Sequence, residues 1–172
     1  MRDGTENTFC AEMIKKEFGE QRNLTLIPPD ITFKKQLELD LGEISCTIEH
    51  VGGDHARDSS VIFVREEKVL FLGDCLYPNL YNQYTVNATL LLLDQLQKYD
   101  ADTYVLSHEE PLSKSEFHVY VNLLRSLCHL TWKTNGNRDR ITTRLANQMG
   151  GELGPIEQMA IDCFVNGIQS SG

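Results

Sequence analysis

Two short apolar runs, separated by four charged residues, constrain the fold of this chain most strongly. Residues 61–64 (Val-Ile-Phe-Val) and 69–72 (Val-Leu-Phe-Leu) flank the segment Arg-Glu-Glu-Lys at 65–68. Runs of this length, rich in β-branched and aromatic residues and bounded by polar turns, are typical of strands. The pattern predicts a β-hairpin with a charged turn, whose second strand stops at Gly73 and Asp74.

Further strands are expected on both sides of this hairpin. Upstream, three segments alternate apolar and polar residues with a period of two: 31–33, 37–41 and 44–48. This alternation predicts a meander of antiparallel strands with one covered face. Downstream, the β-forming segment 103–106 ends shortly before His108. The expected sheet is therefore mostly antiparallel.

Helical patterns occur at the start of the chain and dominate its end. Apolar residues recur at helical spacing in five segments: 7–18, 86–99, 113–133, 139–149 and 155–168. Ser113 and Glu116 have the spacing of a capping box that opens the third of these helices.

We find no internal repeat and no low-complexity linker, so we expect one α+β domain. We divide it into an amino-terminal helix and loop (1–26), a sheet region (27–111) and a helical carboxyl-terminal region (112–172).

The charge balance and the apolar runs indicate which partners and which cellular compartment to expect. The 172 residues carry 25 acidic against 16 basic side chains, and the formal charge of −9 argues against nucleic acid or an anionic membrane as a partner. Apolar runs such as 90–93 are far shorter than the roughly 20 residues needed to cross a bilayer. The polar residues 1–4 have no signal-peptide character. We expect a cytoplasmic protein.

The five cysteines are scattered and form no Cys-x-x-Cys pair, which predicts neither a disulfide framework nor a zinc ribbon. Cys75 directly follows Asp74, and two interpretations stay open for it. It is either a plain core cysteine or, if it faces the same cleft as Asp74, a thiol that meets oxidants or a metal ion.

Three potential metal ligands share one structural context. His55 lies in a glycine-containing loop ahead of a strand, while Asp74 and His108 each follow the carboxyl end of a strand. Strands of a packed sheet deliver such residues to a common rim, so they can converge on one cation. Imidazole and carboxylate together suit zinc, iron or manganese, and a carboxylate can bridge two such ions. Each residue alone is more commonly a loop or turn residue, so the inference depends on the ordered set.

The stretch 50–74 resembles the second half of the metallo-β-lactamase fold. In that family a glycine-rich loop with a histidine, a hairpin and Leu-Phe-x-Gly-Asp follow one another, as His55 and residues 70–74 do here. Residues 101–111 resemble the family's strand that ends in Gly-His-Gly, with Ser107 and Glu109 in place of the two glycines. The resemblance covers about residues 27–111.

The resemblance implies an αββα sandwich and a metal-dependent hydrolase. It makes His55 a ligand of the first metal, Asp74 the bridging carboxylate and His108 a ligand of the second metal. Zinc is the first expectation, with iron or manganese as alternatives. In the complete site a metal-bound hydroxide would attack an ester, thioester, amide or phosphoester of a small-molecule substrate.

One family motif is missing from this sequence. Family members carry His-x-His-x-Asp-His in the amino-terminal half, and the nearest segment here, 50–55, has Gly52 in place of the second histidine. We therefore expect an incomplete sandwich and a partial domain, whose metal occupancy and activity the sequence does not decide. One alternative is that the chain is a hydrolase or the remnant of one. The other is that it is a non-catalytic binding or dimerisation module, whose exposed sheet is covered by a second copy or another chain. A third alternative is that a partner supplies the missing ligands.

Asp58 follows His55 by three residues and has two interpretations of equal weight. It either orients the imidazole through a hydrogen bond or caps the loop. We assign no chemistry to the remaining histidines, His50, His118 and His129, and expect Arg138, Arg140 and Arg144 to form a solvated helix face.

Overall fold

The computed structural model describes residues 4–19, 25 and 27–169, and of these it describes the side chains at 11–19, 25 and 27–168. The chain divides into two compact units, Met1–Thr32 and Phe33–Gly172. The first unit contains α1 (Gly4–Phe18), which confirms the helix expected at 7–18. The helix ends just before Gly19. Residues 20–24 and 26 of the expected loop lie outside the described residues.

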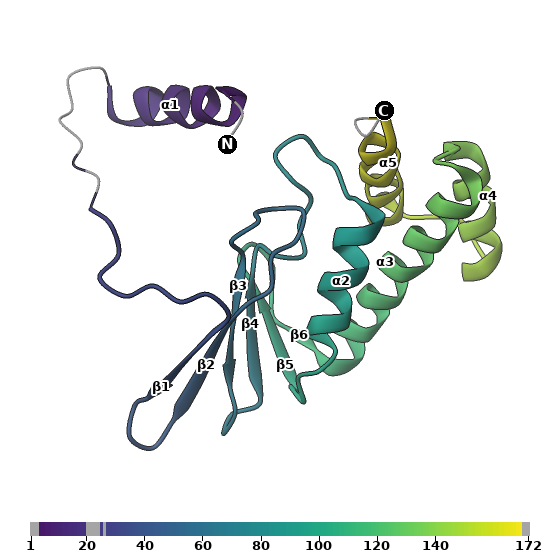
Figure 1. Ribbon diagram of the computed structural model, residues 1–172. Helices are drawn as coiled ribbons and strands as arrows, with labels where there is room; N and C mark the ends of the chain where they lie inside the picture. Colours follow the sequence, from purple (N-terminus) through teal and green to yellow (C-terminus); the bar gives the residue numbers. More distant parts are fainter. Residues whose placement is uncertain (1–3, 20–24, 26, 170–172) are drawn as a thin grey trace. The chain divides into compact units, whose positions relative to one another are not determined.

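The second unit contains a six-stranded sheet whose strands lie in sequence order (Figure 1). The strands are β1 (Gln36–Asp40), β2 (Ser45–His50), β3 (Ser60–Val64), β4 (Val69–Gly73), β5 (Thr103–Leu106) and β6 (Leu112–Ser113). Neighbouring strands are antiparallel except β4 and β5, which are parallel. The hairpin at 61–72 and the mostly antiparallel sheet of an α+β fold are thus confirmed.

The strands of the structure differ from the predicted ones in two places. Residues 31–33 form no strand: Ile31 is 68% exposed, and the pairing of β1 with β2 begins only at Gln36. The prediction was wrong because alternation alone does not supply a hydrogen-bonding partner. The short strand β6 was not predicted, since two residues are too few to show a period.

Four helices follow the hairpin: α2 (Val86–Leu96), α3 (Lys114–Thr134), α4 (Arg138–Met149) and α5 (Pro155–Gln169). The capping box of α3 is confirmed, because the Ser113 hydroxyl accepts from the Glu116 N–H and the Glu116 carboxylate accepts from the Ser113 N–H. α2 ends three residues earlier than the pattern at 86–99 suggested. Within the described residues, no helix has the length and apolarity needed to span a membrane.

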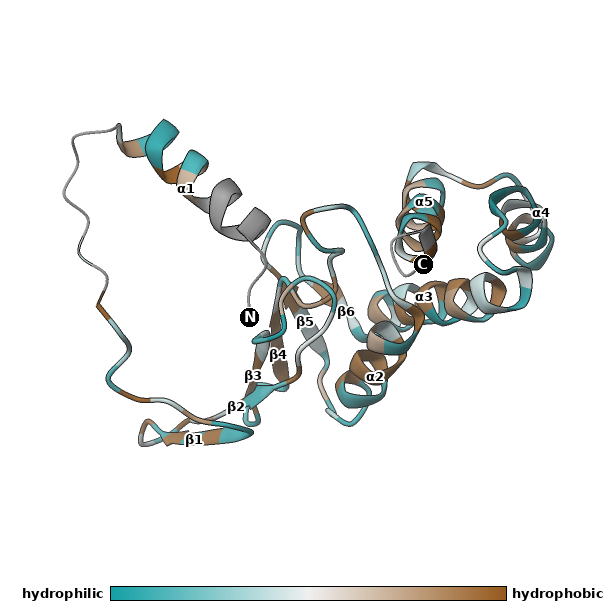
Figure 2. Cartoon of the chain, turned by 45° about the horizontal axis from the view of Figure 1, so that its top comes forward, coloured by the Kyte–Doolittle hydropathy of each residue, from teal (hydrophilic) through white to brown (hydrophobic). Residues whose placement is uncertain are grey.

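The hydrophobic core lies between one face of the sheet and the helices. Val61, Leu70 and Leu72 are fully buried on that face, and Leu93 of α2 and Leu127 of α3 are fully buried with them. Figure 2 shows the corresponding hydropathy, with α2 largely hydrophobic and α4 largely hydrophilic.

The opposite face of the sheet is apolar and open. Ile62 and Phe71 are paired across β3 and β4, and they are 38% and 42% exposed. Ile48 and Val105 continue this row on β2 and β5 and are half-buried. We call these four residues the open sheet face.

Candidate metal centre

The parallel pairing of β4 and β5 brings Asp74 and His108 to one edge of the sheet. β4 ends at Gly73, where the backbone has φ +55°, a conformation that glycine adopts at little cost. Asp74 follows directly, and His108 lies two residues beyond the end of β5 at Leu106. Because carboxyl ends of parallel strands share an edge, residues 34 positions apart become neighbours.

The Asp74 carboxylate lies between two imidazoles. Its Oδ2 is 3.5 Å from Nε2 of His55, and its Oδ1 is 3.4 Å from Nε2 of His108. Both separations exceed the 2.7–2.9 Å typical of charge-assisted hydrogen bonds. The structure thus brings together all three residues predicted from the sequence, with Nε2 of each histidine facing the Asp74 carboxylate.

One oxygen of this carboxylate has no other partner. Asp74 Oδ1 is buried and makes no hydrogen bond, an arrangement that costs free energy unless a cation or donor occupies the space beside it. In the part of the chain that the structure describes, no three His, Cys, Asp or Glu side chains are already arranged to hold an ion. The donor types nevertheless fit zinc, iron or manganese.

A backbone carbonyl sets the orientation of His55. Its Nδ1 lies 3.0 Å from the carbonyl oxygen of Pro78, and donation from Nδ1 leaves a lone pair on Nε2, facing Asp74. The hydrogen bond considered for Asp58 is therefore made by Pro78. The side chain of Asp58 is exposed, and its own carbonyl accepts a hydrogen bond of 3.4 Å from the Ser60 hydroxyl.

The loop that carries His55 is fixed to helix α2 by Asp54. The Asp54 carboxylate accepts hydrogen bonds from the Thr85 N–H at 3.0 Å, the Thr85 hydroxyl at 2.8 Å and the Thr89 hydroxyl at 3.1 Å. Thr85 is the N-cap of α2, so the carboxylate lies at the positive end of the helix dipole. The loop also packs tightly, because a Cβ at Gly53 would lie 3.1 Å from the Cys75 carbonyl oxygen.

Tyr77 contacts both histidines of the site. Its ring is edge-on to His55, with centroids 6.4 Å apart, and tilted against His108 at 5.5 Å. The Tyr77 hydroxyl donates to the Glu109 carboxylate at 2.7 Å. Burial, together with this bond to Glu109, raises the pKa of Tyr77 above its usual range. Tyr77 was not predicted from the sequence, where Glu109 stands out only as a departure from the family pattern.

Cys75 is a core cysteine. Only 1% of its surface is exposed, and burial raises the pKa of its thiol to about 12. Among the described side chains, Cys46, Cys75, Cys128 and Cys163 are free thiols, while the side chain of Cys10 lies outside that set.

Three solved structures are similar to this chain. A metallo-beta-lactamase from Pontibacter korlensis is 22% identical over 71% of this chain and 62% of its own, with a TM-score of 0.47. The sec-alkyl sulfatase PisA1 from Pseudomonas sp., in a double-mutant form, is 19% identical over 72% of this chain and 20% of its own, with a TM-score of 0.51. A mutant flavo di-iron protein from Thermotoga maritima is 14% identical over 70% of this chain and 34% of its own, with a TM-score of 0.43.

The chain therefore spans less than two thirds of each of these proteins. No curated protein matches it significantly. The model of the metallo-beta-lactamase superfamily matches residues 7–108, a segment that includes His55, Asp74 and His108. Because that match covers more than half of the sequence, the chain belongs to the metallo-beta-lactamase superfamily.

Proposed function

We propose that this chain is a metal-dependent hydrolase domain in which His55, Asp74 and His108 hold the metal. The superfamily covers hydrolases and its members generally bind metal ions. The observation that carries the proposal is the Asp74 carboxylate, which faces Nε2 of both histidines and has a buried oxygen without a hydrogen bond. Zinc is the first candidate, because two imidazoles and a carboxylate are a ligand set that it commonly takes.

Each residue has a distinct part in this proposal. Asp74 directs one oxygen at each imidazole, as a carboxylate shared between two histidine ligands would. Pro78 keeps Nε2 of His55 available by accepting from Nδ1. His108 is 70% exposed, against 29% for His55, so substrate would approach from the His108 side.

The ion would supply the reactive chemistry: once bound, it lowers the pKa of a coordinated water and polarises the substrate. The proposed substrates are small molecules with an ester, thioester, amide or phosphoester bond. Catalytic zinc sites usually have three protein donors, so we propose that His55, Asp74 and His108 hold one ion. A second ion would need donors beyond these three residues.

The experiment compares hydrolysis by chelator-treated protein before and after zinc is added back. p-Nitrophenyl acetate and bis-p-nitrophenyl phosphate serve as probe substrates. We expect zinc to restore hydrolysis of at least one probe, and Asp74→Ala to abolish that gain. Asp58→Ala removes an exposed carboxylate from the neighbouring turn, and this variant should retain the zinc-dependent gain in hydrolysis. Equal rates for Asp74→Ala and Asp58→Ala would contradict the proposal.

A second candidate function, a dimerisation module, is favoured by the open sheet face. Ile62 and Phe71 place exposed apolar surface at the centre of the sheet, and such a patch is a typical association surface. We propose that a second copy of the chain covers it. Light scattering should then give twice the chain mass, and Phe71→Lys should give the monomer. Leu91→Lys, at a residue of α2 that is 66% exposed, is the matched control and should remain dimeric. A monomeric wild-type protein would refute this candidate.

A further inference from the structure

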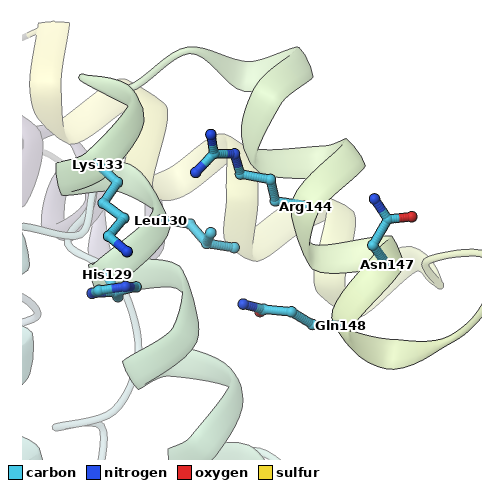
Figure 3. Close-up of a pocket in the computed structure, with 6 residues that line it drawn as sticks. All are labelled: His129, Leu130, Lys133, Arg144, Asn147 and Gln148. Carbon is cyan, nitrogen blue, oxygen red and sulfur yellow. The ribbon is translucent and has the colours of Figure 1, made fainter.

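Helices α3 and α4 form a pocket of about 290 Å³ that the proposed metal chemistry does not use. Its lining is polar apart from Leu130: His129, Leu130 and Lys133 from α3, and Arg144, Asn147 and Gln148 from α4. His129 and Leu130 precede Lys133 by four and three residues, and Asn147 and Gln148 follow Arg144 by three and four, so each set lies along one face of its helix. Figure 3 shows Lys133 and His129 on one wall and the Gln148 amide directed toward the same space from the other wall.

The pocket is cationic although the chain carries a formal charge of −9. Several other basic side chains lie in ion pairs: Lys68 and Lys114 with Asp100, Arg125 with Asp94, and Arg138 with Asp162. Among the described residues, no carboxylate lies within ion-pairing distance of Lys133 or Arg144. Two uncompensated cations that line the same pocket repel each other, and a bound anion would offset that repulsion.

The donors identify the kind of anion. Arg144 offers a planar fork, Lys133 a point charge, and Asn147 and Gln148 add amide N–H groups. A phosphoryl group, with three terminal oxygens and nearly two negative charges, uses such a set more fully than a carboxylate with two oxygens. Leu130, only 2% exposed, is the one apolar residue of this lining, and the volume is at the lower end for small-molecule pockets.

We propose that the α3–α4 pocket binds the phosphate group of a phosphorylated small molecule. This proposal does not depend on the metal site, whose residues lie at the ends of β4 and β5 and in the His55 loop. Arg138, Arg140 and Arg144 are all exposed, as expected from the sequence. Arg138 pairs with Asp162, whereas Arg144 lines the pocket.

The test is a titration followed by backbone amide NMR, with EDTA present so that no metal site competes for phosphate. The probes are inorganic phosphate, ribose 5-phosphate and, as the unphosphorylated control, ribose, all at constant ionic strength because screening weakens such binding. Both phosphate probes should shift the amide signals of residues 129–133 and 144–148, and ribose should shift none.

Variants then assign the binding to the pocket. We expect Arg144→Gln and Lys133→Met each to weaken ribose 5-phosphate binding at least tenfold. Arg140→Gln makes the same charge change on α4 at an exposed position outside the pocket and should bind as wild type does. The three positions are exposed, and thermal melts will check that the variants remain folded. Equal binding by Arg144→Gln and Arg140→Gln, signal shifts elsewhere in the chain, or binding of inorganic phosphate without ribose 5-phosphate would overturn the proposal.

Discussion

The Tyr77 hydroxyl donates a 2.7 Å hydrogen bond to the Glu109 carboxylate and thereby joins the loop after β4 to the loop after β5. The Tyr77 ring also contacts His55 and His108. Glu109 stands where the family pattern has a glycine, so this chain has a connection across its site that a glycine would not make.

The first prediction concerns this connection. Glu109→Gly removes the carboxylate that holds Tyr77 beside His108. Loss of a hydrogen bond made directly to a metal ligand typically weakens metal binding 10- to 100-fold, and Glu109 acts on His108 only through the Tyr77 ring, so we expect an effect at the lower end of that range. We expect zinc affinity to fall about tenfold, measured by competition with a chromophoric chelator. Glu110→Gly introduces the same backbone freedom at the next, exposed residue and should leave the affinity unchanged. Equal affinities for the two variants would show that Tyr77 does not need Glu109.

A second prediction tests the attachment of the His55 loop to α2. Asp54→Ala leaves the Thr85 N–H and the buried Thr89 hydroxyl without their acceptor. We expect the free energy of unfolding to fall by about 2 kcal/mol, the size of one or two lost charge-assisted hydrogen bonds. Urea denaturation measures it, and Asp58→Ala should change the value by less than about 0.5 kcal/mol. A similar loss in both variants would contradict this role for Asp54.

The capping box of α3 gives a pH-dependent prediction. The hydrogen bonds from the Ser113 hydroxyl and N–H lower the pKa of Glu116 below its usual value of about 4.3. The carboxylate therefore contributes stability above that value, and the contribution is lost as the pH falls through the lowered pKa. Urea denaturation should find wild type more stable than Glu116→Gln at pH 7, and the difference should vanish in strong acid. A difference independent of pH would show that the charge of Glu116 has no part in the cap.

Local patterns in the sequence predicted local structure well. The hairpin at 61–72 and the Ser113–Glu116 box involve residues close together in the chain, where period and capping rules act directly. The convergence of Asp74 and His108 was also predictable, because both follow strands that share a sheet edge.

Long-range side-chain contacts were not predictable. Asp54 and Thr85 are 31 residues apart, and Tyr77 and Glu109 are 32 apart. Their pairing depends on how the loops pack, and the periodicity of the sequence does not predict loop packing. The α3–α4 pocket was missed for the same reason, since the sequence does not show that Lys133 and Arg144 line the same space.

The most direct test of the central claim is a zinc titration of chelator-treated protein by calorimetry. The wild-type chain should bind one zinc ion, and Asp74→Asn should weaken binding at least a hundredfold, because two histidines are too few donors for a stable site. His118→Gln, which removes an exposed histidine on α3, should bind as wild type does. Two results would contradict the assignment of His55, Asp74 and His108 as a metal site: no zinc binding by the wild-type chain, or the same zinc affinity in Asp74→Asn as in wild type.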